Sequence, residues 1–446
     1  MAPRHFLIFV SLLALFLLLA IRNVSPEPYA YDEADYMYAA RFGFAANWSD
    51  TPSISVADFL RAGLHRGGAQ PLSDRIRGSN DVLFYRHFHG PLLHYFLIPV
   101  SRLAWSERAV RSVLLAIPAA TLAVIYFGCL WLSSETAALL AAMLFLTSHA
   151  VLFSSEIAPH QLFALCSVAC LILLMKAIAT KRRAYWYGSV AAAGLAFCTL
   201  EVGFVLVLSV AICGWIAWRQ FLVKSLCVFL ATVLVVWPAA ILRLSFLKSS
   251  AAMAYLATMR QAPWGQVGFI DTWRERIFDS PLEWALIAIA LLAGVRSVRG
   301  LYPLWIFAAL MIAATLRVFT TTPRYSLTFL PVLDVLAGLT LLTPFACLRR
   351  PASFAVVTLA VAGLYGNAGI QASRCSHNSN PRSTAVLTFI HQNELENKAL
   401  LAPRSDVPAL HFYFPAMRLR GYAGQTPSDS ERAGFAADAV IPAAKP

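Results

Sequence analysis

The sequence predicts an all-α polytopic membrane protein with about 11 transmembrane helices. Of its 446 residues, 59% are hydrophobic and only 13% are charged, and the mean hydropathy is +0.64. One water-soluble core does not need so many apolar side chains. Apolar runs long enough to cross roughly 30 Å of hydrocarbon recur along nearly the whole chain. We also expect a long first extracytoplasmic loop with interfacial helices and a small C-terminal α/β extracytoplasmic domain.

The first apolar run, residues 6–21, has two interpretations. It could be the apolar core of a signal peptide or a retained membrane span. The residues after it, Arg22 to Pro26, show no clear small-residue cleavage pattern. We therefore predict a retained first span.

The predicted spans are defined by their length and by the polar breaks between them. They cover residues 5–21, 109–132, 136–153, 160–178, 185–199, 202–218, 222–242, 283–295, 301–319, 327–347 and 352–370. Three of them, 185–199, 202–218 and 283–295, are short for a full crossing. Tilted, paired or partly re-entrant segments are the alternatives there.

Basic residues gather in the turns that these spans place on one side of the membrane. The positive-inside rule makes that side cytoplasmic. The turns contain Lys181, Arg182, Arg183, Arg219, Lys224, Arg296, Arg299, Arg349 and Arg350. Residues 22–108, 243–282 and 371–446 then lie outside, although 243–282 also carries basic residues. We expect the inner membrane of a bacterium, with the active site facing the periplasm or the exterior.

The chain changes composition at Gln371, where Asn, Ser, Pro and charged residues become frequent. This divides it into a transmembrane domain at 1–370, with the first extracytoplasmic loop at 22–108, and a small domain at 371–446. The pattern predicts helices at 384–393 and 407–413, and strands at 399–402 and 417–422. The tail is therefore expected to be a small α/β unit.

An acidic cluster opens the first long loop. Residues 31–41 look helical, and on a helix Asp32, Asp35 and Tyr36 share one face while Glu33 points roughly 100° away. Carboxylates near a membrane surface can act as general bases. The alternative is structural: Asp32 would be the N-cap, and the other two carboxylates would complement the helix dipole.

A second polar segment, residues 85–95, contains Arg86 and His89 and leads into an apolar piece at 92–105 that is too short to span. That piece is expected to lie in the membrane interface. Arg and His at phosphate depth can hold an oxyanion. The alternative is an ordinary interfacial anchor whose side chains reach lipid headgroups.

Together these motifs resemble the GT-C glycosyltransferases, above all the protein O-mannosyltransferases and the aminoarabinose transferase of lipid A. Asp32-Glu33 matches the family's Asp-Glu pair, and His89-Gly90-Pro91-Leu92 its Lys/His-Pro-Pro-Leu segment. Further similar segments are Ser106 to Ser112, Phe153 to His160, and Thr322 to Leu327. The resemblance covers most of residues 1–345 as architecture, with short motifs. Gly90 replaces a Pro, and Ala158 and His160 replace Arg and Tyr, which puts donor contacts there in doubt.

The resemblance implies a membrane glycosyltransferase that moves a sugar, with inversion, from a polyprenyl-phosphate donor to a protein, lipid or glycan acceptor outside the cytoplasm. It implies Asp32 as the base, with Glu33 as its catalytic neighbour. The other expected site residues fall into two groups. The donor phosphate would meet Arg86, His89, His160 and Arg324, with Arg317 as a further candidate, and acceptor or loop contacts would come from Asp35, Tyr36 and Glu156.

Two other classes of function stay open at this point. A transporter or flippase of lipid-linked or small substrates should show paired repeats and polar sites near the midplane. No repeat is evident, although Glu201 and Asp334 lie in or near apolar runs. An O-antigen polymerase or ligase would concentrate basic residues in a large late loop.

Nucleic acid is not expected as a partner, because much of the net charge of +13 serves topology. No cofactor is certain, and a divalent metal is compatible with Asp32, Asp35, His87 and His89 in one loop.

Overall fold

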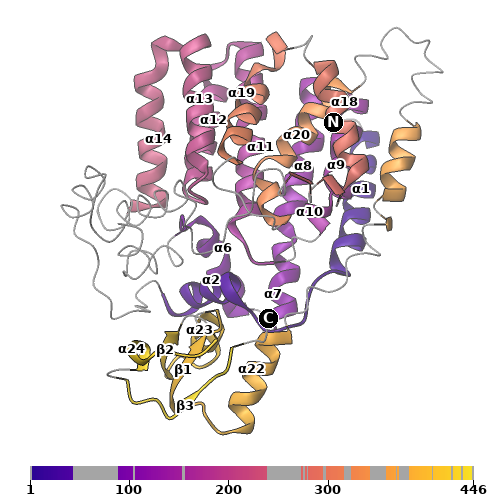
Figure 1. Cartoon of the computed structure of the whole chain (residues 1–446). Helices are drawn as coiled ribbons and strands as arrows, with labels where there is room; N and C mark the ends of the chain where they lie inside the picture. The colour runs from indigo at the N-terminus through magenta and orange to yellow at the C-terminus, as the bar shows by residue number, and fades with distance from the viewer. Residues whose placement is uncertain are drawn as a thin grey trace.

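The computed structural model describes the chain as a helical bundle with smaller elements at one end (Figure 1). The described residues are 3–43, 89–103, 106–152, 156–238, 273–274, 277–278, 280–294, 298–315, 323–341, 358–367, 369–370, 381–403, 405–422, 425–432 and 435–443. Arg86, His87 and Arg317 lie outside them. The structural statements below concern this part of the chain.

Each predicted span overlaps a helix in the structure. The bundle contains α1 (Pro3–Ile21), α7 (Glu107–Leu114), α8 (Ala116–Leu132), α9 (Glu135–Thr147), α10 (His149–Leu152), α11 (Pro159–Thr180), α12 (Arg183–Phe197), α13 (Gly203–Ala217), η1 (Arg219–Phe221), α14 (Leu222–Val236), α18 (Pro281–Gly294), α19 (Val298–Thr315), η3 (Pro323–Thr328) and α20 (Leu330–Thr340). The last predicted span overlaps a helix at 358–367. Four helical segments are long and apolar enough to cross a membrane: Pro3–Asn23, Glu107–Leu132, Pro159–Thr180 and Arg219–Val236. This is an integral membrane protein, and about 11 crossings remain a prediction.

Helix α11 lies at the centre of the bundle. It packs against α8, α12 and α20. Its own buried, mostly apolar residues lie on every face of the helix, as expected for a helix in the interior of a bundle. Pro159 occupies its first turn, where a missing N–H costs nothing, and Lys181 ends it in a left-handed conformation. With 22 residues, α11 separates its N-terminus from the basic turn at its C-terminus by about 33 Å.

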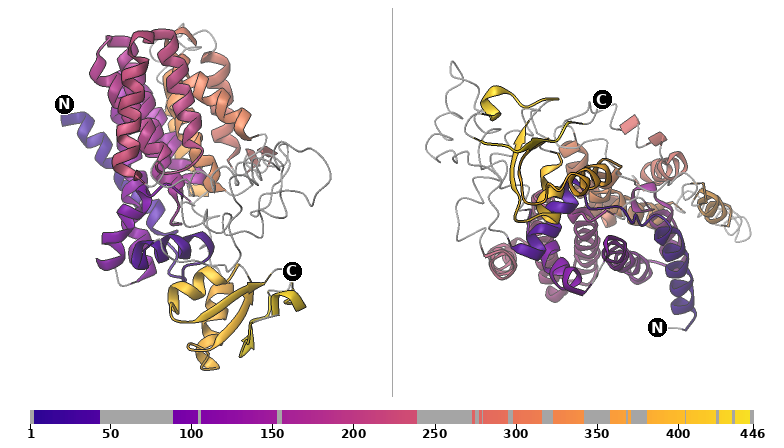
Figure 2. Two further views of the ribbon diagram at one scale, coloured as in Figure 1. Left: turned by 90° about the vertical axis from the view of Figure 1, so that its left-hand side faces the viewer. Right: turned by 90° about the horizontal axis from the view of Figure 1, so that it is seen from below.

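Two short helices, α2 (Tyr31–Phe42) and α6 (Leu92–Leu103), lie at the end of the bundle where α11 begins (Figures 1 and 2). Both fall within the predicted first loop. A shared apolar cluster, separate from the main core, joins Ala34 and Met37 of α2 to Leu93 and Leu97 of α6 and to Leu162 of α11. This cluster fixes α2 against the N-terminal end of α11.

The C-terminal residues form a small α/β unit beside α2. Its elements are α22 (Pro381–Gln392), β1 (Ala399–Pro403), α23 (Val407–Tyr413), β2 (Arg418–Tyr422), α24 (Asp429–Arg432) and β3 (Ala439–Val440). The three strands are parallel in the order β2-β1-β3, with Leu400 paired to Leu419 and to Ala439. Ile390 of α22 and Leu410 of α23 pack on this sheet. Helix α23 also packs on α2, which therefore lies between the bundle and the sheet.

The packing of α9 on α20 predicts a size limit at Gly338. A Cβ atom there would lie 2.6 Å from Ala141 Cβ and 2.7 Å from the Ala137 carbonyl oxygen. Gly338→Ala should therefore force the two helices apart and cost about 1–3 kcal/mol of stability. Thermal unfolding of the purified protein in detergent measures the loss.

Gly300→Ala is the matched control, because a Cβ on Gly300 in α19 meets nothing within 4 Å. Alanine favours the helix more than glycine does, so this variant should be neutral or slightly stabilised. Equal melting temperatures for the two variants would contradict the packing described for α9 and α20.

Candidate active site

Helix α2 begins with the acidic cluster, but no side chain caps it. Its N-cap is Ala30, in extended conformation, and Tyr31 has a φ of 45°. The alternative that Asp32 is the N-cap is therefore wrong. Asp32 and Glu33 lie in the first turn, where their charges complement the helix dipole. Their oxygens do not cap α2, and the two side chains take separate partners.

Glu33 forms a buried, two-point ion pair with Arg111 of α7. Arg111 donates from Nε to Oε1 at 3.1 Å and from Nη2 to Oε2 at 2.6 Å. The backbone N–H of Ile157 also donates to Oε1, at 2.7 Å. Only 8% of Glu33 and 4% of Arg111 are exposed. Such a pair has a defined geometry, so it fixes the rotation of α2.

The same arginine holds the chain that leads into α2. Its Nη1 donates to the carbonyl oxygens of Ser25 at 2.9 Å and Glu27 at 2.7 Å. Its guanidinium carbon lies 5.1 Å from the ring centroid of Tyr29. Arg111 therefore connects the end of α1, the start of α2 and the first turns of the next predicted span.

Asp32 points to a different set of partners. Arg324 of η3 donates from Nη2 to Asp32 Oδ2 at 2.6 Å, and its Nη1 lies 3.5 Å from Glu156 Oε2. The side chains of Asp32 and Glu156 are 34% and 31% exposed. Unlike Glu33, these carboxylates can be reached by a substrate. Arg324 Nε is buried and has no hydrogen-bond partner among the described residues.

His89 lies beside Glu201, which comes from the connection between α12 and α13. His89 Nδ1 is 3.0 Å from both carboxylate oxygens of Glu201. The next residue, Gly90, passes so close to Cys198 that a Cβ would lie 1.9 Å from the Cys198 carbonyl oxygen. That oxygen accepts a hydrogen bond from the N–H of Leu92 at 3.2 Å. Glycine is thus required here, which explains one departure from the family motif.

Aromatic rings pack beside these ionic groups. The Tyr36 ring lies 5.7 Å from the His89 ring, and the His160 ring meets the Tyr325 ring at 4.7 Å, edge to face. Burial and the nearby negative charge of Asp32 raise the pKa of Tyr36. Tyr36 therefore keeps its proton and can serve as a hydrogen-bond donor.

The charge state of His89 follows from its surroundings. Burial alone would lower its pKa, but the charge of Glu201, the hydrogen bond to it and the charge of Asp32 raise the pKa above the usual value. The protonated form therefore persists to higher pH than in a free histidine. Arg324 and His89 together give this end of the bundle two cations.

The structure thus brings most of the predicted residues together at the N-terminal end of α11. Asp32, Tyr36, His89, Glu156, His160 and Arg324 belong to this group. Glu33 faces away from it, toward Arg111, and Asp35 is buried on α2. The predictions for Arg86 and Arg317 concern residues outside the described ranges.

Sequence reasoning missed three partners. Tyr325 directly follows Arg324 in the Thr322 to Leu327 segment, and Arg111 lies inside the Ser106 to Ser112 segment. Glu201 was noted for its position at a span end but was not matched to His89. In the described part of the chain, no group of three or more His, Cys, Asp or Glu residues is arranged to hold a metal ion.

One protein-family model matches part of the chain. The family model for the dolichyl-phosphate-mannose-protein mannosyltransferases matches residues 88–246. The match includes His89, His160 and Glu201. No curated protein sequence matches the chain significantly.

Solved structures establish the fold. ArnT from Cupriavidus metallidurans, in the apo state, matches 97% of this chain and 89% of its own, with a TM-score of 0.61 and 14% identity. The oligosaccharyltransferase AglB from Archaeoglobus fulgidus matches 92% of this chain and 64% of its own, with a TM-score of 0.56 and 14% identity. The fold is that of the GT-C glycosyltransferases, and the resemblance predicted from the sequence is confirmed.

The buried pair of Glu33 and Arg111 predicts a large loss of stability in Glu33→Gln. The change leaves Arg111 buried without its counter-charge, which should cost about 3–5 kcal/mol. Chemical or thermal unfolding in detergent measures this loss. Glu396→Gln is the control, because the Glu396 and His391 side chains are 39% and 63% exposed. That variant should change stability by about 1 kcal/mol or less, and similar losses in both variants would show that the buried pair does not hold α2.

Proposed function

We propose that this integral membrane protein transfers a sugar from a polyprenyl-phosphate donor to an acceptor on the extracytoplasmic side of the membrane, with inversion at the anomeric carbon. One observation carries the proposal: a reachable carboxylate, Asp32, lies beside two cations, Arg324 and His89, at one end of a GT-C fold. Such a site can accept a proton and stabilise a departing phosphate.

The proposed reaction is a single displacement. An oxygen of an acceptor hydroxyl attacks the anomeric carbon, and its proton passes to a carboxylate oxygen of Asp32. The bond between that carbon and the phosphate oxygen breaks, and the lipid phosphate leaves with the electron pair. Attack opposite to the leaving group inverts the anomeric configuration. Asp32 is close enough to the cations to place the base and the leaving group in one site.

Arg324 and His89 would stabilise the phosphate on which negative charge develops. Arg324 already contacts two carboxylates, and its buried Nε has no hydrogen-bond partner among the described residues. A guanidinium has five N–H donors, so it can contact a phosphate while it keeps a carboxylate in place. His160 lies against Tyr325 at the edge of this group. We further assign Arg86 to the donor phosphate, following the family motif.

The remaining predicted residues take supporting roles in the proposal. Tyr36, which keeps its proton, and Glu156, which faces Arg324, are assigned to acceptor contacts, and Asp35 to the loop on that side. Glu33 is assigned as a positioning residue, because its oxygens are taken by Arg111 and by the N–H of Ile157. Its catalytic effect would come from holding α2, and with it Asp32, in place.

A lipid-linked donor fits the comparisons as well as the site. One similar structure is ArnT bound to undecaprenyl phosphate, and another is AglB in complex with an inhibitory peptide and a dolichol-phosphate. We propose the same class of donor here, with a hexose or a pentose as the sugar. The acceptor would be a protein, a lipid or a glycan.

The proposal places the enzyme in a bacterial inner membrane. Residues 1–370 would form the transmembrane domain, with about 11 crossings, and residues 371–446 a small extracytoplasmic domain. The site lies at the start of α11, whereas the basic turn from Lys181 to Arg183 lies at its other end. The positive-inside rule then directs the site to the periplasm.

Asp32→Asn should lower the rate of sugar transfer by about 10²–10⁴-fold, because asparagine cannot accept the proton. Asparagine has the same shape, so donor affinity should change little. The purified protein, reconstituted with a panel of polyprenyl-phosphate sugars and acceptors, provides the rate and the donor affinity. Arg324→Ala is the matched comparison, and it should weaken donor binding more than acceptor binding.

Two outcomes of this experiment would count against the proposal. Full transfer by Asp32→Asn would exclude Asp32 as the base. An absence of transfer by the wild type with every donor would favour the transporter or flippase, and vesicle uptake of the same lipid-linked sugars would then be the measurement to make.

Donor binding should weaken as the pH rises through the pKa of His89, because the phosphodiester keeps its charge while His89 loses its proton. The pKa is raised, so full binding should extend above the range of an ordinary histidine. Glu201→Gln removes the charge that raises it, and the loss of binding should then begin at lower pH. Donor affinity measured from pH 5.5 to about 9 tests this. An unchanged profile in Glu201→Gln would show that His89 does not contribute its charge.

A further inference from the structure

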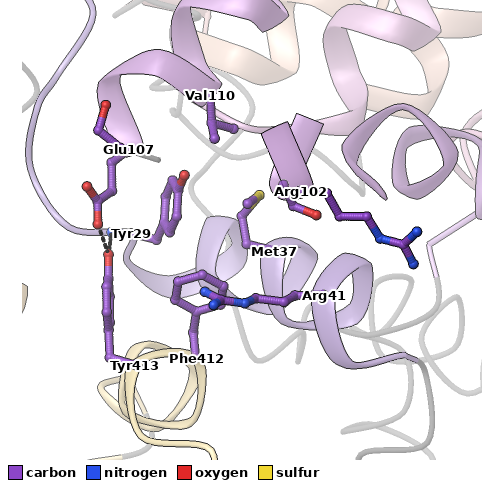
Figure 3. A pocket seen from close by; sticks show the side chains of 10 residues that line it. Tyr29, Met37, Arg41, Arg102, Glu107, Val110, Phe412 and Tyr413 are labelled. Atoms are coloured by element: carbon purple, nitrogen blue, oxygen red, sulfur yellow. Dashed lines mark hydrogen bonds between the residues drawn. The ribbon is translucent and has the colours of Figure 1, made fainter. Parts of the chain in front are cut away.

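A cavity lies on the other side of α2 from Asp32. It has a volume of about 380 Å³ and is formed by α2, α6, α7 and α23, together with Tyr29. Figure 3 shows Tyr29, Phe412 and Tyr413 on one side of it and Met37 and Val110 on another. Its size is that of a small ligand site. None of the residues assigned above to donor or acceptor contacts lines it.

The cavity has aromatic walls held in a defined arrangement. The Tyr29 and Phe412 rings meet edge to face at 5.2 Å. The hydroxyl of Tyr413 donates to Glu107 Oε1 at 2.8 Å and accepts from the N–H of Tyr29 at 2.9 Å. These contacts join the C-terminal unit to the bundle, so the walls come from both parts of the chain.

The charged groups of the cavity are unevenly paired. The Arg41 guanidinium lies over the rings of Phe42 and Phe412, with its central carbon 5.5 and 5.8 Å from their centroids. Figure 3 shows the Arg41 side chain extending from α2 toward the Phe412 ring. Among the described carboxylates, none forms an ion pair with Arg41 or with Arg102, whose side chain reaches outward at the rim. Two arginines against one carboxylate, Glu107, leave the cavity positive.

These features specify the chemistry of a ligand. The faces of a sugar ring carry C–H groups that pack on aromatic rings, and its edges carry hydroxyls that hydrogen-bond to carboxylates and serines. Ser101, Ser106 and Glu107 supply such groups at the cavity wall. A guanidinium that lies over a ring and forms no ion pair with a carboxylate can donate two parallel hydrogen bonds to an anionic group. Arg41 is exposed, so water hydrates its charge when the cavity is empty. A neutral sugar bound over it would displace this water without supplying an anionic oxygen in its place.

We propose that this cavity binds a sugar that carries an acidic group, a carboxylate or a phosphate, with Arg41 as its counter-ion. The site is separate from the proposed transfer reaction, because the cavity and Asp32 lie on different sides of α2. It joins α2 to α23, so an acidic glycan bound there would hold the C-terminal unit against the helix that carries Asp32.

Calorimetric titration tests the proposal with the full-length protein in phosphatidylcholine nanodiscs. The probes are glucuronic acid and glucose 6-phosphate, with glucose as the neutral counterpart. Both acidic sugars should bind saturably and at least tenfold more tightly than glucose. Arg41→Gln should weaken them at least tenfold, and Arg41→Lys, which keeps the charge but not the planar group, should have an intermediate effect.

The control variant is Arg108→Gln, because Arg108 is an exposed arginine of α7 that does not line the cavity. It should bind the acidic sugars like the wild type. All three arginine variants should keep the wild-type melting temperature. Equal affinity in Arg41→Gln and wild type, or no saturable binding of either acidic sugar, would overturn the proposal. So would loss of glucuronic acid binding in nanodiscs with phosphatidylglycerol, because a lipid headgroup would then occupy the cavity. The calorimetric titration measures sugar binding and not sugar transfer, so its outcome is independent of the Asp32→Asn experiment.

Discussion

The geometry of the site depends on one buried ion pair, Glu33 with Arg111. Arg111 holds the first turn of α2 and the chain before it, and the N–H of Ile157 holds the same carboxylate from the side of α11. Three parts of the chain that are far apart in sequence therefore meet at Glu33. Asp32 is the preceding residue on the same helical turn, roughly 100° round the helix. Fixing Glu33 toward Arg111 therefore directs Asp32 to a different face, toward Arg324.

The two neighbouring carboxylates thus show how burial divides roles. Glu33 is enclosed, is matched by a guanidinium and has its oxygens occupied, which suits a structural ion pair. Asp32 is one-third exposed and shares an arginine with Glu156, which suits a group that must meet a substrate. A close backbone contact holds His89 in place. Gly90 packs against Cys198, and this positions the His89 imidazole beside Glu201.

Hydropathy and local pattern were sufficient for the elements that are set by local physics. The apolar runs coincide with helices, residues 31–41 are helical, and the residues from 384 to 422 fold into the predicted order of helix, strand, helix and strand. Partner choice could not be read in this way. The pairs of Glu33 with Arg111 and His89 with Glu201 join residues 78 and 112 positions apart. The start of α2 was also hard to predict, because its N-cap, Ala30, has no capping side chain and Asp32 is the first residue of a type that commonly caps helices.

In the proposed reaction, Arg324 and His89 bind the donor phosphate on the same side of α2 as Asp32. The direct measurement is a cryo-electron microscopy structure of the protein in nanodiscs with a non-transferable polyprenyl-phosphate sugar bound. We expect phosphate density within hydrogen-bonding distance of the Arg324 guanidinium and the His89 ring, with the anomeric carbon facing Asp32. Phosphate density on the far side of α2, beside Arg41, with the Asp32 and Arg324 pair unoccupied, would contradict it.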